Sequence, residues 1–194
     1  MFSSRAAVLL PALGLFYAPS MAGAEDFTAA MESYLESTIN SFANHDVLVE
    51  AIRSQNAETA GLTQADIDAL DSAWRSEIGL SERPTIDPVL NNAASDFLRG
   101  VVADAGGTIT EVFIMDARGL NVATSGVTSD YWQGDEAKHS ETYPNGAGAV
   151  HFSEIEFDES SQSYQGQISL SIVDPASNEV VGAMTVGVDA EALF

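Results

Sequence analysis

Three adjacent residues, Asp130-Tyr131-Trp132, place a carboxylate beside two aromatic rings in an otherwise polar segment. Aromatic rings supply flat apolar surface and attract cations, and a carboxylate pairs with an ammonium group. The combination therefore predicts a binding site for a small ligand. The competing interpretation is structural: Trp132 fills the core and Asp130 caps a helix.

A second group of candidates lies in the segment 163–173, where polar and apolar residues alternate as they do in a strand. Its polar face consists of Gln165, Gln167, Ser169 and Ser171. His151 and Ser153 are similar candidates in the preceding strand-like segment. These side chains either line a binding pocket or form the solvent face of a half-exposed sheet, and the sequence favours neither.

Asp135, Glu136 and His139 form a third cluster, in which Asp135 and His139 would share one face of a helix. Two ligands without a third make a poor metal site, so a surface helix explains the pattern better. The remaining acidic residues do not follow the calcium-loop pattern, and a loose cation site stays as a weaker alternative.

Sequence signatures of catalysis are missing: the chain has no G-x-S-x-G, H-E-x-x-H, P-loop or G-x-G-x-x-G motif. Its histidines, His45, His139 and His151, are far apart along the chain. We therefore expect no enzymatic activity and no cofactor.

Three helices are expected in the first part of the chain. A long one starts near Phe27, and its apolar stripe consists of Phe27, Met31, Tyr34, Leu35, Ile39 and Phe42. A second begins after Thr63, with Asp66 at the capping-box position, and its buried face is Ile67, Leu70, Trp74 and Ile78. A third is expected from Asp87 as N-cap and Pro88 as first residue to about residue 105.

From Thr108 the apolar spacing changes to the alternation typical of strands. Five strands are expected, over residues 108–116, 120–124, 150–157, 163–173 and 180–188. Short turns between most of them favour antiparallel pairing. The expected fold class is therefore α+β, with a five-stranded antiparallel sheet and helices packed on one face.

Residues 1–24 have the features of a secretory signal peptide: Arg5, an apolar stretch over residues 6–17 and an Ala22-Gly23-Ala24 cleavage motif. Residues 25–107 would then be the helical part and residues 108–194 the sheet part of one exported domain. The chain has no cysteine, which excludes disulfides and thiolate chemistry and suits a bacterial periplasm.

The composition is strongly acidic: 29 Asp and Glu against 7 Lys and Arg among 194 residues give a formal net charge of -22. Such a chain repels polyanions, so nucleic acid and anionic membrane surfaces are excluded as partners. The acidic residues form no block, and 45% of the residues are hydrophobic, as in a folded domain.

Three stretches resemble the Cache (PDC) family of PAS-like extracytoplasmic sensor domains. They are residues 110–124, a strand ending in Asp116-x-x-Gly119 with its return strand; residues 129–136, the aromatic segment; and residues 167–189, two closing strands. The resemblance implies a PAS-like five-stranded sheet, a long N-terminal helix and a pocket between the sheet and the segment after the second strand.

The resemblance also implies a small-metabolite ligand, contacted by Asp130, Tyr131, Trp132, His151, Gln167 and Ser169. In amino-acid-binding members an Arg near the aromatics grips the ligand carboxylate. Here the segment contains no Arg and its nearest base is Lys138, which favours a cationic or neutral ligand.

We therefore expect a periplasmic binding protein that captures a small metabolite. Because the sequence ends at Phe194, just after the last strand, signalling would require a separate membrane sensor kinase or chemoreceptor. The alternative is an interaction module without a ligand, which forms a homodimer or docks a receptor through its long N-terminal helix.

Overall fold

A computed structural model describes residues 21–158 and 163–194 of the chain. The first helix begins at Met21, so the predicted signal peptide lies almost wholly outside the described residues. Export therefore stays a prediction. None of the helices within the described ranges combines the length and apolarity that a bilayer crossing needs.

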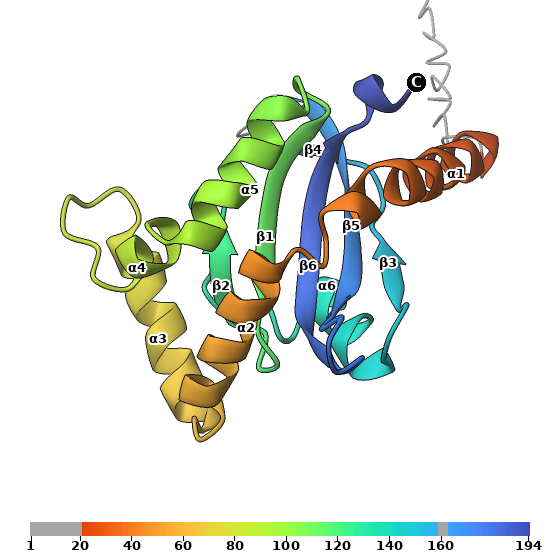
Figure 1. The fold of residues 1–194 in the computed structure, drawn as a ribbon. Coiled ribbons are helices and arrows are strands. Elements are labelled where there is room, and N and C mark those ends of the chain that lie inside the picture. Colours follow the sequence, from red (N-terminus) through yellow and green to blue (C-terminus); the bar gives the residue numbers. More distant parts are fainter. Residues whose placement is uncertain (1–20, 159–162) are drawn as a thin grey trace, which may run out of the picture.

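The sheet is antiparallel throughout and has the strand order β2-β1-β6-β5-β3, with β4 also paired to β5 (Figure 1). Its strands are β1 Ile109–Met115, β2 Asn121–Thr124, β3 Val150–Phe152, β4 Glu156–Asp158, β5 Ser163–Val173 and β6 Val180–Asp189. The expected α+β class is confirmed, with six strands among the described residues in place of the expected five.

The extra strand arises because the expected strand over residues 150–157 is interrupted at Ser153. Phe152 pairs with Ile168 and Glu156 pairs with Gln165, so the register slips by one residue between them. The Ser153 hydroxyl accepts the hydrogen bond of the Gln167 N–H at 2.8 Å, in the place of a backbone carbonyl. The edge of the sheet is thereby divided into β3 and β4.

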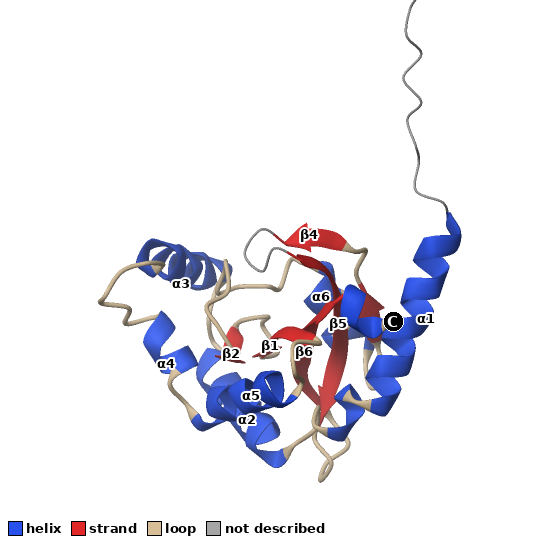
Figure 2. Cartoon of the chain, turned by 90° about the horizontal axis from the view of Figure 1, so that it is seen from above, coloured by secondary structure: helices blue, strands red, loops and turns tan. Residues whose placement is uncertain are grey.

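The helices cover both faces of the sheet unequally. They are α1 Met21–Ser37, α2 Asp46–Thr59, α3 Gln64–Glu77, α4 Ile86–Leu90, α5 Ala93–Asp104 and the short α6 Ala137–Ser140, with 3-10 turns η1 Ile39–Ser41, η2 Tyr143–Asn145 and η3 Glu191–Leu193. Figures 1 and 2 show α1, α2 and α5 on one face and α6 on the other. The expected packing on one face thus holds for α1, α2 and α5.

The main core lies between the sheet and those three long helices. Its fully buried members include Ile39, Ile52, Leu98, Ile114, Ile168 and Met184. The opposite face has a smaller core of Phe113, Met115 and Ala183, against which Tyr143 of η2 packs. This thinner layer leaves room for polar side chains between the sheet and the segment that covers it.

Helix ends follow local side-chain chemistry. The capping box at Thr63 and Asp66 is confirmed, since each side chain bonds the other residue's backbone N–H. The single helix expected from Asp87 is wrong: Asn92 accepts a hydrogen bond from Ser95 N–H at 2.9 Å and begins α5 separately from α4. Ile78, expected to be buried, is 46% exposed because α3 ends before it.

Candidate functional site

A cavity of about 360 Å³ lies on the thinly covered face of the sheet, between β1, β5 and the segment 127–138. This is where the resemblance implied a pocket. Its lining consists of Glu111, Phe113, Val127, Thr128, Ser129, Gln133, Lys138, Gln165 and Gln167. We call it the sheet cavity. Its volume falls in the range of sites for small metabolites, and polar groups reach it from three separate segments.

The charged residues of this lining are one acid and one base. Glu111 Oε1 accepts a hydrogen bond from Gln167 Nε2 at 3.2 Å. The Lys138 ammonium lies 5.5 Å from the centre of the Phe113 ring and 3.1 Å from Glu136 Oε2, and its side chain is only 16% exposed. The sheet cavity therefore offers a carboxylate, an ammonium group and several amides, with no net charge from its lining.

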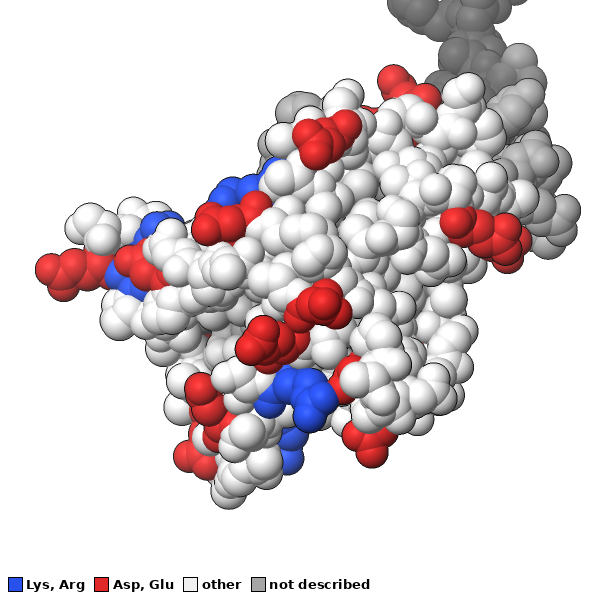
Figure 3. Space-filling view, in the orientation of Figure 1, with Lys and Arg blue, Asp and Glu red and all other residues white. Residues whose placement is uncertain are grey.

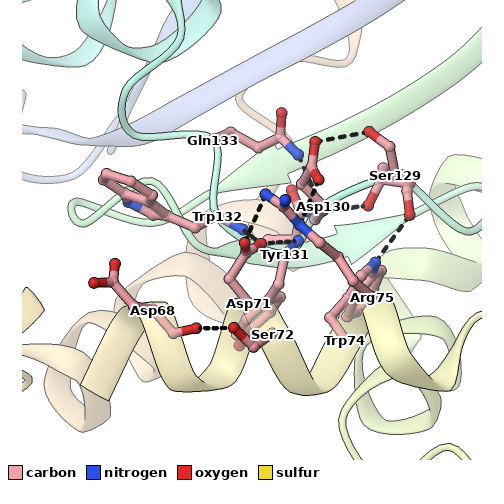
Figure 4. Close-up of polar contacts among 12 residues, drawn as sticks. Asp68, Asp71, Ser72, Trp74, Arg75, Ser129, Asp130, Tyr131, Trp132 and Gln133 are labelled. Carbon is pink, nitrogen blue, oxygen red and sulfur yellow. Dashed lines mark hydrogen bonds and ion pairs between the residues drawn. The ribbon is translucent and has the colours of Figure 1, made fainter. Parts of the chain in front are cut away.

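Helix α3 holds the cavity wall from outside (Figure 4). Asp71 Oδ1 accepts hydrogen bonds from the backbone N–H groups of Tyr131 (2.9 Å) and Trp132 (3.1 Å). Arg75 bridges Asp71 (2.7 Å) and Asp130 (2.9 Å). The Asp130 carboxylate is thus directed to α3. An acceptor for two consecutive N–H groups fixes the segment's backbone in place.

Two aromatic residues add to this attachment. The Trp74 indole N–H donates to the Thr128 carbonyl at 2.9 Å, and the Trp74 ring stacks on Tyr131 with ring centres 5.3 Å apart. Burial, together with the nearby carboxylates of Asp116 and Glu58, raises the pKa of Tyr131 to about 12. The Tyr131 hydroxyl therefore stays protonated at any physiological pH.

The inner side of the wall is held by the sheet. Asn121 Nδ2 donates to Thr128 Oγ1 and to the Asp130 carbonyl, both at 2.9 Å. The Trp132 indole N–H donates to the Arg118 carbonyl at 2.8 Å, which places the ring over the β1–β2 turn. Segment 127–133 is therefore attached both to the sheet and to helix α3.

A larger opening lies on the other side of the same segment, among the helices. This groove has a volume of about 680 Å³. It is lined by residues of α2, α3, the α3–α4 connection, α4 and the start of α5, together with Val122 and Tyr131. We call it the helical groove. Tyr131, which was expected to contact a ligand over the sheet, lines the helical groove and is not part of the sheet-cavity lining.

The structure separates the six predicted ligand-binding residues. Gln167 lines the sheet cavity, whereas Ser169 is fully buried and its hydroxyl lies 3.0 Å from that of Thr185. His151 is half-buried and pairs with Ser169 across β3 and β5. The other three, Asp130, Tyr131 and Trp132, belong to the wall, as described above. Their roles in binding stay predictions.

Sequence reasoning missed the residues that come from distant parts of the chain. Glu111 and Lys138 line the sheet cavity, and Asp71 and Arg75 organise its wall. The absence of Arg from residues 129–136 is offset by Arg75, which reaches Asp130 from α3. Alternation along β1 placed Glu111 on the face of Phe113, which was the one signal available.

His139 of the third cluster faces inward rather than toward solvent. His139 is 5% exposed, its Nε2 lies 3.2 Å from the Asp116 carbonyl, and its ring stacks on Tyr143. Burial lowers the pKa of His139 below its ordinary value. Across the two described ranges, no three His, Asp or Glu side chains come together as they would around a metal ion.

Comparison with known proteins gives similarity of fold only. No protein-family model and no curated protein matches the chain. Similar solved structures include the sensor domain of the Vibrio cholerae (V. cholerae) histidine kinase DctB, with 14% identity and a TM-score of 0.48 over 89% of this chain. A second is the ligand-binding domain of the Campylobacter jejuni chemoreceptor Tlp3 with L-valine, with 12% identity and a TM-score of 0.42 over 86% of this chain. A third is the extracellular domain of the putative histidine kinase rpHK1S-Z16, with 16% identity and a TM-score of 0.42 over 85% of this chain.

The present chain covers 55, 64 and 60% of those three chains, less than two thirds of each. They are a sensor domain and an extracellular domain of histidine kinases and a ligand-binding domain of a chemoreceptor. At such identities and scores, the likeness concerns the arrangement of helices and strands.

Proposed function

We propose that this chain is an extracytoplasmic, Cache-like sensor domain that binds a small polar metabolite in the sheet cavity. The observation that carries the proposal is the convergence of Glu111, Gln167 and Lys138 on one cavity from β1, β5 and the covering segment. Such convergence of a few polar groups at a concave site is typical of metabolite binding.

The lining favours a neutral or zwitterionic ligand. Glu111 suits an ammonium or hydroxyl group, and Lys138 suits a carboxylate or carbonyl. The amides of Gln165 and Gln167 both donate and accept, so they discriminate by geometry rather than charge. This narrows the preference for a cationic or neutral ligand that the segment alone suggested, because Lys138 supplies the positive charge that residues 129–136 lack.

Occupancy would be passed to the helices through segment 127–133. A ligand touching Thr128, Ser129 or Gln133 contacts the same segment that Asp71 and Arg75 attach to α3. A ligand shifts an equilibrium only by its preference for one state, so it would act by favouring one arrangement of this attachment. A separate membrane kinase or chemoreceptor would read that state at the helical surface.

Thermal unfolding in the presence of a panel of small amino acids, organic acids, amines and polyols tests this function. A compound at 100 times its Kd adds about 2.7 kcal/mol, which raises the Tm of a domain this size by about 5–10 °C. Gln167→Leu should abolish the shift, because it removes an amide from the cavity. Gln64→Leu, on the exposed surface of α3, should leave it unchanged.

No shift with any compound would contradict metabolite binding. An equal shift in the wild type and in Gln167→Leu would place the ligand elsewhere. Sedimentation at several protein concentrations tests the alternative of a ligand-free dimer. A mass that doubles as the concentration rises, without any thermal shift by a ligand, would favour the dimer. A thermal shift at a constant monomer mass would favour the sensor.

A further inference from the structure

The helical groove has a charge pattern that the sheet cavity lacks. Its charged lining residues are Glu50 and Glu58, both exposed on α2, and no Lys or Arg lines it. No ion pair to either glutamate is formed among the described residues. The groove therefore presents uncompensated negative charge.

The two glutamates belong to one stripe of α2. This stripe consists of Val47, Glu50, Ala51, Ser54, Gln55 and Glu58, and all six line the groove. Glu50 and Glu58 are eight residues apart, which corresponds to about 12 Å along a helix. Ser54 lies midway between them, and the two carboxylates thus mark the ends of an elongated site.

The walls between the two ends are mainly apolar. Leu70 of α3, Pro84 of the α3–α4 connection, Pro88 and Val89 of α4, and Ala93 and Ala94 of α5 form them. Figure 1 shows α3 and α4 at the left of the molecule, beside α2 and α5. An apolar channel that ends in carboxylates suits an aliphatic chain that ends in cations.

Buried hydrogen bonds fix these walls. Glu77 Oε2 accepts from the backbone N–H groups of Thr85 (2.8 Å) and Ile86 (3.0 Å), which closes the connection that carries Pro84. Asn92 Nδ2 donates to the Val122 carbonyl at 3.1 Å, which attaches the start of α5 to the sheet. A preformed groove loses little conformational entropy on binding.

None of the basic side chains in residues 21–158 and 163–194 lines the groove, and those around it are engaged elsewhere. Arg53 pairs with Asp174, Arg75 with Asp71 and Asp130, and Arg83 with Asp87. Figure 3 shows acidic side chains scattered over this face with few basic ones among them. Arg53, one turn from Glu50, is paired with Asp174, so neither Glu50 nor Glu58 has an ion-pair partner among the described residues.

We propose that the helical groove binds a linear aliphatic polyamine, with one terminal ammonium group beside Glu50, the other beside Glu58, and the methylene chain along the apolar walls. Tyr131 also lines the groove and adds aromatic surface to its walls. The proposal does not depend on the function proposed for the sheet cavity.

Isothermal titration of the full chain with spermidine, at about 0.15 M salt to screen unspecific attraction, tests the proposal. We expect one site per chain, and weaker binding of the shorter diamine putrescine. Glu50→Gln combined with Glu58→Gln should weaken spermidine binding about tenfold. Ser54→Phe, which fills the groove without changing charge, should abolish it.

The matched control is Glu32→Gln with Glu36→Gln, which removes two exposed glutamates from one face of α1, away from the groove. It should leave the affinity unchanged, as should Gln167→Leu in the sheet cavity. An equal loss in the α1 control would show unspecific attraction to an acidic protein and overturn the proposal. Absence of binding, or full binding by Ser54→Phe, would overturn it as well.

Discussion

Replacement of Asp71 by alanine removes the side chain that attaches segment 127–133 to α3. In the wild type its Oδ1 accepts from two backbone N–H groups, those of Tyr131 and Trp132, and its Oδ2 pairs with Arg75. Asp71 is 8% exposed and the two hydrogen bonds are partly buried, so both N–H groups lose an acceptor that water replaces only in part.

The expected loss can be worked out from these contacts. A buried N–H group without an acceptor costs about 1–3 kcal/mol. Because the N–H groups of Tyr131 and Trp132 are only partly buried, we assign about 1 kcal/mol to each of them. The Arg75 contact adds about 0.5 kcal/mol, because that side chain is 59% exposed. Asp71→Ala should therefore reduce the free energy of unfolding by about 2.5 kcal/mol.

Urea denaturation measured with a common m-value is the assay. Asp71→Asn keeps an oxygen acceptor for the two N–H groups and should lose only about 1 kcal/mol. Asp68→Ala, one turn earlier on the exposed face of α3, removes one contact with Gln64 and should lose about 0.5 kcal/mol or less. If Asp71→Ala is no more destabilising than Asp68→Ala, the segment is not held as described.

Three further predictions concern local features of the fold. Thr63→Ala removes the confirmed capping box and should cost about 1 kcal/mol in urea denaturation, with Ser72→Ala on the same helix as a near-neutral control. Gly119→Ala should cost more than about 2 kcal/mol, because φ is +79° and a Cβ would lie 2.4 Å from Gly134 Cα, whereas Gly126→Ala, which meets nothing within 4 Å, should cost little; equal effects would refute the close approach. His139 has a lowered pKa in the folded protein, since burial disfavours its charged form, so the unfolded state takes up the proton first as pH falls below the ordinary value of 6.5. Stability contributed by neutral His139 is therefore complete above that pH and is lost as pH falls toward the folded-state pKa. The urea midpoint should drop between pH 7.5 and 5.5, and this drop should be smaller in His139→Gln; an unchanged drop would show that His139 is not its source.

The elements with regular patterns were predictable from sequence, because their signal is local. Alternation predicted the strand over residues 163–173 with the bounds of β5, and the cap at Thr63 predicted the start of α3. The break at Asn92 was not predictable with the same rules. Asp87-Pro88 is a good helix start by itself, and the competing cap at Asn92 gains a further bond to Val122 only in the folded protein.

The candidate site was less predictable because distant residues build it. Periodicity places Gln167 and Ser169 on one face of β5, yet it cannot say that the segment after β2 leaves an opening over Gln167 and buries Ser169. Arg75 precedes Asp130 by 55 residues, and no local pattern connects the two. Segment 129–136 was singled out from sequence as a ligand-contacting region. In the structure its backbone and Asp130 bond to α3, while Ser129 and Gln133 line the sheet cavity, and its role in binding stays a prediction.

The segment 127–133 separates two openings of different chemistry. Thr128, Ser129 and Gln133 face the sheet cavity, whose lining carries balanced charge, while Tyr131 faces the acidic helical groove. A ligand in either opening would contact the same short stretch of backbone. Under the two proposals, titration of one ligand in the presence of the other measures whether this shared wall couples them.

A crystal structure with the panel compound that raises the Tm most shows where a ligand binds. We expect this compound between β1, β5 and segment 127–138, within hydrogen-bond distance of Glu111 and Gln167. A compound found in the helical groove or on the outer surface, with the sheet cavity unchanged, would contradict this expectation.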